Sequence, residues 1–129
     1  MKKSMLIACG ITTCSVFLAG CSDFYSWKNT PSEAEVASLR EKAATDLHSD
    51  DLLTVKQGLN VFRLYGDTND ISMVVPLLDH PDLMVHAAAC TTLRTLADIP
   101  GKDYSPEGRT QDEVSREIRD LLTKKGYLK

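Results

Sequence analysis

The sequence predicts an all-α domain, a short α-solenoid of two helical hairpins followed by a C-terminal capping helix. Three observations predict it. Apolar residues recur at helical spacing through residues 31–126, and no segment alternates with period two over a useful length. Helix-capping sequences precede several of the expected helices. Residues 47–65 and 78–96 repeat one pattern at an offset of 31 positions, a period that stacked helical hairpins produce.

The first helix is expected over residues 31–47. Residues 30–33, Thr-Pro-Ser-Glu, have the form of a capping box with proline at the first helical position. Apolar residues follow at helical spacing: Val36, Leu39, Ala43 and Leu47.

The second helix is expected near residues 50–65, opened by Ser49 or Asp50 and ended by Gly66. It carries two apolar stripes: Leu52, Val55, Leu59 and Phe62 in one, and Leu53, Val61 and Leu64 in the other. A helix that is apolar beyond one stripe must be covered on more than one side. This pattern favours a helix between its hairpin partner and the next repeat.

A third, short helix is expected over residues 71–78, opened by Asn69 or Asp70 and bent by Pro76. Residues 79–82, Asp-His-Pro-Asp, then form a turn.

That turn places Pro81 at the first position of the fourth helix. We expect the fourth helix to run to about Ala97, and Pro100 and Gly101 to stop the chain from continuing it.

Residues 110–113, Thr-Gln-Asp-Glu, form a second capping box and open the fifth helix, which Gly126 ends. Its apolar residues lie in one stripe: Val114, Ile118, Leu121 and Leu122. One apolar stripe and a charged outer face are what the cap of a solenoid requires. Residues 127–129 are expected to be a tail.

The repeat resembles a known family. The offset of 31 aligns Leu47 with Leu78, Asp51 with Asp82, Leu52 with Leu83, Gly58 with Ala89, Phe62 with Leu93, and Arg63 with Arg94. Residues 74–97 resemble a HEAT repeat of the short bacterial kind, with Leu-Leu before an Asp-x-Pro-Asp turn and Val85 followed by alanines and Leu93. One departure is His86, where such repeats commonly carry arginine. Residues 101–122 are similar to the tail that often closes bacterial HEAT-like domains.

The resemblance implies a binding face. HEAT-like proteins hold ligands on the concave face formed by the second helix of each hairpin. Applied to this chain, the candidates are Lys56, Asn60, Arg63, His86, Cys90 and Arg94. The alternative for each is a solvated or packing residue.

The loop over residues 98–109 is a second candidate, because loops of about 12 residues are often functional. Tyr104 is the residue there most able to anchor a partner. The alternative is a loop that only crosses to the capping helix.

The N-terminus predicts export. Residues 1–3 are Met-Lys-Lys, and residues 4–20 form an uncharged, mostly apolar run. A spanning helix needs roughly 20 apolar residues. This run is shorter and diluted by glycine, serine and threonine. Residues 1–20 therefore have the pattern of a secretory signal peptide.

Residues 18–21, Leu-Ala-Gly-Cys, resemble the lipobox of bacterial lipoproteins at all four positions. The resemblance implies a diacylglycerol on the thiol of Cys21, an N-acyl chain on the new amino terminus, and a tether over residues 21–30. Several acyl chains give lasting membrane attachment, since each buried CH₂ contributes about 0.8 kcal/mol. In a cell with two membranes, Ser22 after the cysteine favours the outer membrane facing the periplasm over the inner membrane.

Composition narrows the function. Residues 21–129 contain thirteen basic and eighteen acidic residues, a net charge of −5, which is unsuited to nucleic acid. Cys90 is the only cysteine after Cys21, so no disulfide within the mature chain is expected, and a lone thiol is usually a small buried apolar residue. No zinc-ligand spacing and no hydrolase or phosphate-binding signature occurs. We expect no catalysis, no cofactor besides the lipid and no small-molecule substrate.

Two functions remain from this reasoning. One is an envelope adaptor, a lipid-anchored helical domain that docks another envelope protein. The other is a carrier lipoprotein of the pilotin kind, which escorts or stabilises an outer-membrane or secretion subunit. They differ in the effect of loss: without an adaptor the partner stays in its membrane but is inactive, whereas without a carrier it is mislocalised or degraded.

Overall fold

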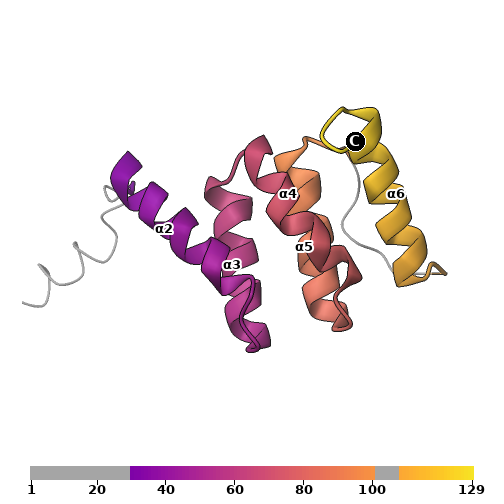
Figure 1. Ribbon diagram of the computed structural model, residues 1–129, viewed down its shortest axis with the longest axis horizontal. Helices are drawn as coiled ribbons and strands as arrows, with labels where there is room; N and C mark the ends of the chain where they lie inside the picture. Colours follow the sequence, from indigo (N-terminus) through magenta and orange to yellow (C-terminus); the bar gives the residue numbers. More distant parts are fainter. Residues whose placement is uncertain (1–29, 101–107) are drawn as a thin grey trace, which may run out of the picture. The chain divides into compact units, whose positions relative to one another are not determined.

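The computed structural model describes residues 30–100 and 108–129 of the chain. The chain divides into two units, Met1–Ser32 and Glu33–Lys129, and every described helix lies in the second (Figure 1). Within the described residues this unit is all-α and contains no strand. The predicted fold class is confirmed.

The first hairpin consists of α2 (Glu33–Asp46) and α3 (Leu52–Tyr65). The prediction that Pro31 opens the first helix is wrong, because α2 begins two residues after it. The start of α3 also differs from the prediction by one or two positions. Asp51 is its N-cap, and the Asp51 carboxylate accepts hydrogen bonds from the backbone N–H of Thr54 at 2.9 Å and its hydroxyl at 2.6 Å.

A close approach of the two helices holds the first hairpin together. A Cβ atom added to Gly58 of α3 would lie 3.0 Å from the carbonyl oxygen of Ala43 and 3.1 Å from Cβ of Asp46. The absence of a side chain at Gly58 therefore lets α2 pack closely on α3. The apolar stripe predicted for α2 is only partly covered, since Ala43 and Leu47 are buried while Leu39 is exposed.

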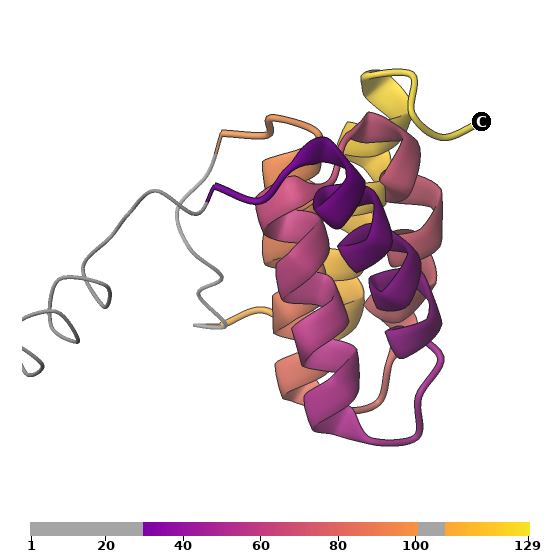
Figure 2. The same cartoon turned by 90° about the vertical axis from the view of Figure 1, so that its left-hand side faces the viewer.

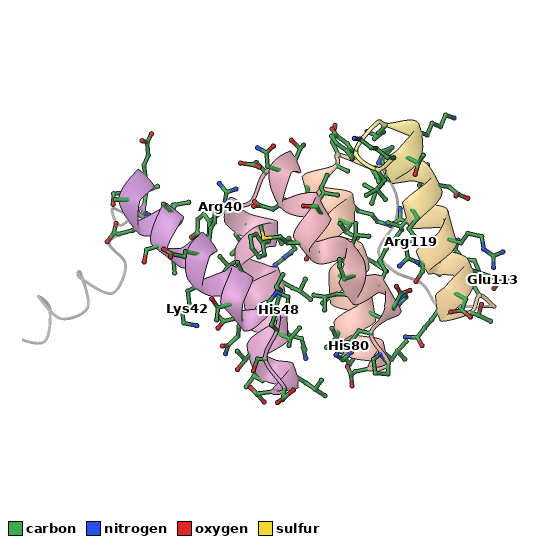
Figure 3. All side chains as sticks on the ribbon, viewed as in Figure 1. Arg40, Lys42, His48, His80, Glu113 and Arg119 are labelled. Carbon is green, nitrogen blue, oxygen red and sulfur yellow. The ribbon has the colours of Figure 1, made fainter. Side chains whose placement is uncertain are left out.

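An ion pair joins α2 to the segment after α3. Arg40 of α2, labelled in Figure 3, contacts the carboxylates of Asp70 at 2.6 Å and Asp67 at 3.0 Å. The hydrogen bond to Asp70 is the main cause that raises the pKa of Arg40. Asp70 is buried, so removing Arg40 would leave a buried carboxylate without its cation.

The first partner of the second hairpin is a broken helix. It consists of the 3₁₀ turn η1 (Thr68–Asp70), α4 (Ile71–Val74) and a second 3₁₀ turn, η2 (Val75–Asp79). The bend predicted at Pro76 takes the form of this change from α to 3₁₀ geometry, because proline has no N–H to donate to the preceding turn.

The second partner is α5 (Leu83–Leu96). The prediction that Pro81 is its first residue is wrong. Asp82 is the N-cap, and its carboxylate accepts hydrogen bonds from the N–H groups of Met84 and Val85, both at 3.0 Å. The helix ends within one residue of the predicted position.

The fifth helix, α6 (Gln111–Lys124), begins and ends as predicted. Thr110 and Glu113 form the capping box, and Gly126 follows the helix with a φ of +84°. Lys125 then donates hydrogen bonds at 2.9 Å to the carbonyl oxygens of the two residues that follow α5. The predicted stripe faces the core, where Val114, Ile118 and Leu122 are buried.

The second helices of the two hairpins lie side by side. Helices α3, α5 and α6 run in the same direction (Figure 1), and α3 contacts α5 directly. Figure 2 shows α3 and α5 in one layer, with α2 and α4 on the other side. None of the helices in the described segments is long and apolar enough to cross a membrane.

Candidate docking face on helices α3 and α5

Helices α3 and α5 bury the same four positions of the repeat. In α3 these are Val55, Gly58, Leu59 and Phe62, and in α5 they are His86, Ala89, Cys90 and Leu93. Each residue of the second set lies 31 positions after its counterpart. The offset found in the sequence is therefore also the spatial register of the two helices.

Helix α5 buries a further side, which faces α3. Its additional buried residues are Val85, Thr92 and Leu96. The hydroxyl of Thr92 lies 3.2 Å from the carbonyl oxygen of Leu59 in α3. The counterparts in α3 are not buried: Thr54, Val61 and Tyr65.

The remaining solvent-facing side of the two helices is the candidate site. We define the α3–α5 face by Lys56, Asn60 and Arg63 of α3 and Ala88, Thr91 and Arg94 of α5. Residues three or four positions apart share one side of a helix, so Lys56, Asn60 and Arg63 form one row. In α5, Ala88 and Arg94 are six positions apart and lie on either side of Thr91. The side chains of Ala88 and Thr91 are small and leave the face open beside this row.

The charge of this face is unusual for the chain. Neither α3 nor α5 contains Asp or Glu, although the whole chain has a net charge of −3. In the described part of the chain, Lys56 and Arg63 form no ion pair. The Arg63 guanidinium donates a hydrogen bond to the side-chain oxygen of Asn60 at 2.7 Å. Two cations are therefore available to a ligand on this face.

A groove of about 250 Å³ lies between α3 and α5. Its lining residues are Leu59, Asn60, Arg63, Ala88, Thr91 and Thr92. Asn60, Arg63 and Thr91 offer hydrogen-bonding groups, and Leu59 and Ala88 offer apolar surface. A groove with this lining can hold one or two side chains of a partner and bind their polar ends.

The two ends of the face differ in chemistry. Leu53 and Met84, which are counterparts in the repeat, are 61% and 59% exposed near the N-terminal ends of α3 and α5. Arg63 and Arg94 lie in the last turns of the same helices. Because the helices run in the same direction, the apolar pair lies at one end and the arginines at the other (Figure 1).

Four of the predicted residues lie on the two helices that flank the groove. Lys56, Asn60, Arg63 and Arg94 all belong to the α3–α5 face. Arg94 differs from Arg63, because its side chain is only 17% exposed and lies 3.8 Å from the carboxylate of Glu117 in α6. Arg94 therefore contributes both to the face and to the packing of the capping helix.

The prediction that His86 lies on the binding face is wrong, because His86 is buried. Cys90, named as a candidate for the same face, is also buried, in agreement with the expectation for a lone thiol. His86 Nε2 lies 2.9 Å from the hydroxyl of Ser115 in α6, and that hydroxyl donates to the carbonyl oxygen of Leu78 at 2.9 Å. Since Ser115 has one proton to give, its oxygen accepts from His86. The buried imidazole links η2, α5 and α6.

Burial also sets the ionisation of these two residues. Removal from water lowers the pKa of His86 and raises the pKa of the Cys90 thiol to about 11. The imidazole is therefore neutral and the thiol protonated at neutral pH.

Other predicted sites lie elsewhere. Cys21 and Tyr104 are outside the described residues. Sequence reasoning missed Ala88, Thr91 and Thr92 as residues lining the groove. The signal for Thr91 was present, since it is the counterpart of Asn60 at the offset of 31. Within residues 30–100 and 108–129, no group of His, Cys, Asp or Glu could hold a metal ion.

Comparison with known protein families, with curated proteins and with solved structures gave no match to this chain.

Proposed function

We propose that the protein is a lipid-anchored adaptor of a bacterial cell envelope. Its acylated Cys21 holds it in the membrane, preferably the outer membrane, and the α3–α5 face docks another envelope protein without covalent chemistry.

One observation carries this proposal. Two neighbouring parallel helices present Lys56, Asn60 and Arg63 beside a groove and contain no acidic side chain. Lys56 and Arg63 form no ion pair with the described residues. Their charges are therefore not explained by ion pairs that hold the domain together. Arginine is enriched in protein–protein interfaces, and polar side chains form their rims.

The anchor is tested by changing Cys21 to serine in the full chain. We expect labelled palmitate to enter the wild-type protein and not the Cys21→Ser variant, and the variant to move from the membrane fraction to the soluble fraction. Cys90→Ser serves as the matched control and should keep both the label and the membrane association. Membrane association of Cys21→Ser equal to wild type would refute the anchor.

The docking face is tested by photo-cross-linking in living cells. A photoreactive amino acid is placed at Asn60 or Thr91 on the face and, as controls, at Ser38 of α2 or Asp120 of α6, both exposed. We expect one discrete cross-linked partner from the two face positions and none from the controls.

A second variant makes the cross-link informative. Lys56→Glu combined with Arg63→Glu should abolish the adduct at Thr91. The variant's free energy of unfolding should fall by only about 1 kcal/mol, the loss expected when a cation is removed from the last turn of a helix, so that the domain stays folded. An adduct of equal yield in this variant would contradict the placement of the face. If the partner becomes mislocalised or degraded when the protein is deleted, the function is that of a carrier.

A further inference from the structure

The charge of the α3–α5 face is opposite to that of the domain around it. Helices α3 and α5 contribute Lys56, Arg63 and Arg94 and no acidic side chain, whereas residues 21–129 carry five more acidic than basic residues. Acidic residues occur where these helices begin, since Asp51 and Asp82 are their N-caps. Two of the three cations, Arg63 and Arg94, lie in the last turns of α3 and α5, and Lys56 lies nearer the start of α3.

Along the axis of each helix, the exposed apolar residue and the arginine lie at opposite ends. Leu53 precedes Arg63 by ten residues in α3, about 15 Å along a helix axis at 1.5 Å per residue. Met84 and Arg94 repeat this separation in α5. A ligand that covers the whole face meets apolar side chains at one end and guanidinium groups at the other.

Resting on the docking function proposed above, we propose that the α3–α5 face binds an acidic segment of the partner protein that carries apolar side chains at one end. Its carboxylates lie over Lys56 and Arg63, which have no competing acidic neighbour in the described residues. Its apolar side chains lie over Leu53 and Met84.

Charge complementarity sets the orientation of the segment. The acidic end avoids Asp51 and Asp82 at the start of the helices, and the apolar end covers the exposed leucine and methionine there. A polyanion of uniform charge, such as nucleic acid or an anionic membrane, would also meet the capping aspartates and the acidic residues of α2 and α6. The face therefore favours a short acidic segment over an extended anionic surface.

A synthetic probe tests the chemistry of the occupant. The probe has a Leu-Leu pair, a Gly-Ser-Gly-Ser spacer and an Asp-Glu-Glu-Asp run. When the spacer is extended, it separates the leucines from the acidic run by about 15 Å. Two controls replace the acidic run by lysines or the leucines by serines. Binding of each labelled peptide to the full chain in nonionic detergent is followed by fluorescence anisotropy at low and high salt.

We expect the acidic probe to bind more tightly than both controls and to lose affinity as salt rises. Lys56→Glu with Arg63→Glu should weaken the acidic probe by about tenfold and bind the lysine probe instead. Changes of the same sign on α6, Arg116→Glu with Arg119→Glu, should have no such effect.

Equal binding of the acidic and lysine probes, or no binding of either, would overturn the proposed occupant. The docking function is judged separately by the cross-links from Asn60 and Thr91 in cells. Cross-links to a segment that is not acidic would refute this inference and leave the docking function intact. Binding of the acidic probe without any cross-link in cells would contradict the docking function itself.

Discussion

Helices α3 and α5 are two copies of one pattern in different surroundings. Both have 14 residues, both begin after an aspartate N-cap, and both bury the same four positions. Helix α3 packs against α2 and α5, whereas α5 packs against α3, α4, η2 and α6. Helix α5 consequently buries three further residues, and its arginine lies near Glu117 of α6, while the equivalent Arg63 donates a hydrogen bond to Asn60 of its own helix.

This difference separates structural roles from binding roles. A residue that the repeat places identically becomes part of the packing in α5 and remains accessible in α3. The place of a helix in the stack, rather than the residue type, decides which of the two roles a repeated side chain has.

The two ends of the stack differ in the same way. The outer side of α6 is charged, as a cap requires. Helix α2, at the other end, leaves Leu39 exposed (Figure 1).

The largest effects are expected where the copies agree. Phe62 and Leu93 are counterparts and both fully buried. Phe62→Ala and Leu93→Ala should lower the free energy of unfolding by about 3–5 and about 2–5 kcal/mol, because each leaves a cavity. Urea denaturation measures both. Leu64→Ala, at an exposed position of α3, is the control and should change stability by about 0.5 kcal/mol or less. If only one of the two core substitutions caused a small loss of stability, the two positions would not be equivalent in the two copies of the repeat.

A second prediction makes α5 more like α3. The counterpart of His86 is Val55, so His86→Val places in α5 the residue that α3 already has. Burial is the main cause that lowers the pKa of His86 in the folded state below 6.5, the value expected in the unfolded chain, and the nearby Asp79 and Asp112 partly offset it. The unfolded chain therefore binds a proton that the folded chain does not, and stability falls as the pH drops below about 6.5.

We expect the wild-type protein to lose more stability between pH 7.5 and pH 5.5 than His86→Val does. At pH 7.5 the variant is the less stable of the two, by about 1 kcal/mol, because the hydrogen bond to Ser115 is gone. His48 and His80 are present in both proteins and cancel in the comparison. Parallel loss of stability in the two proteins would show that His86 does not cause the acid sensitivity.

Local signals in the sequence predicted most of the helices. The capping box at Thr110, the stop at Gly126 and the break at Pro76 depend on side chains within a few residues of the backbone they control. The start predicted at Pro81 was wrong, because the carboxylate of the neighbouring Asp82 accepts hydrogen bonds from two backbone N–H groups. The helix consequently starts after the aspartate and not at the proline.

The candidate site was harder to predict. Helical spacing groups His86 with other residues of α5 but does not say which sides of that helix α6 and η2 will cover. The answer depends on Ser115, 29 positions later, and on its bond to Leu78. Asn60 and Arg63 are exposed and Lys56 is half-buried, because α3 has no second neighbour of this kind on that side.

The smallest effect concerns the two arginines themselves. Arg94→Glu places a carboxylate near Glu117, whereas Arg63→Glu meets no acidic neighbour in the described residues. Both variants lose a cation from the last turn of a helix, which costs about 0.3–1 kcal/mol in each. In thermal unfolding at low salt, we expect Arg94→Glu to lose about 0.5–1 kcal/mol more stability than Arg63→Glu. This difference in stability should shrink in 0.5 M NaCl, because salt screens the repulsion between charges and the screening length is already about 10 Å at 0.1 M. Adding Glu117→Gln to each variant should also narrow the gap, since it removes the repelling charge. If the two single variants lost equal stability, Arg94 would not interact measurably with α6. Both arginines would then be available to a partner on the α3–α5 face.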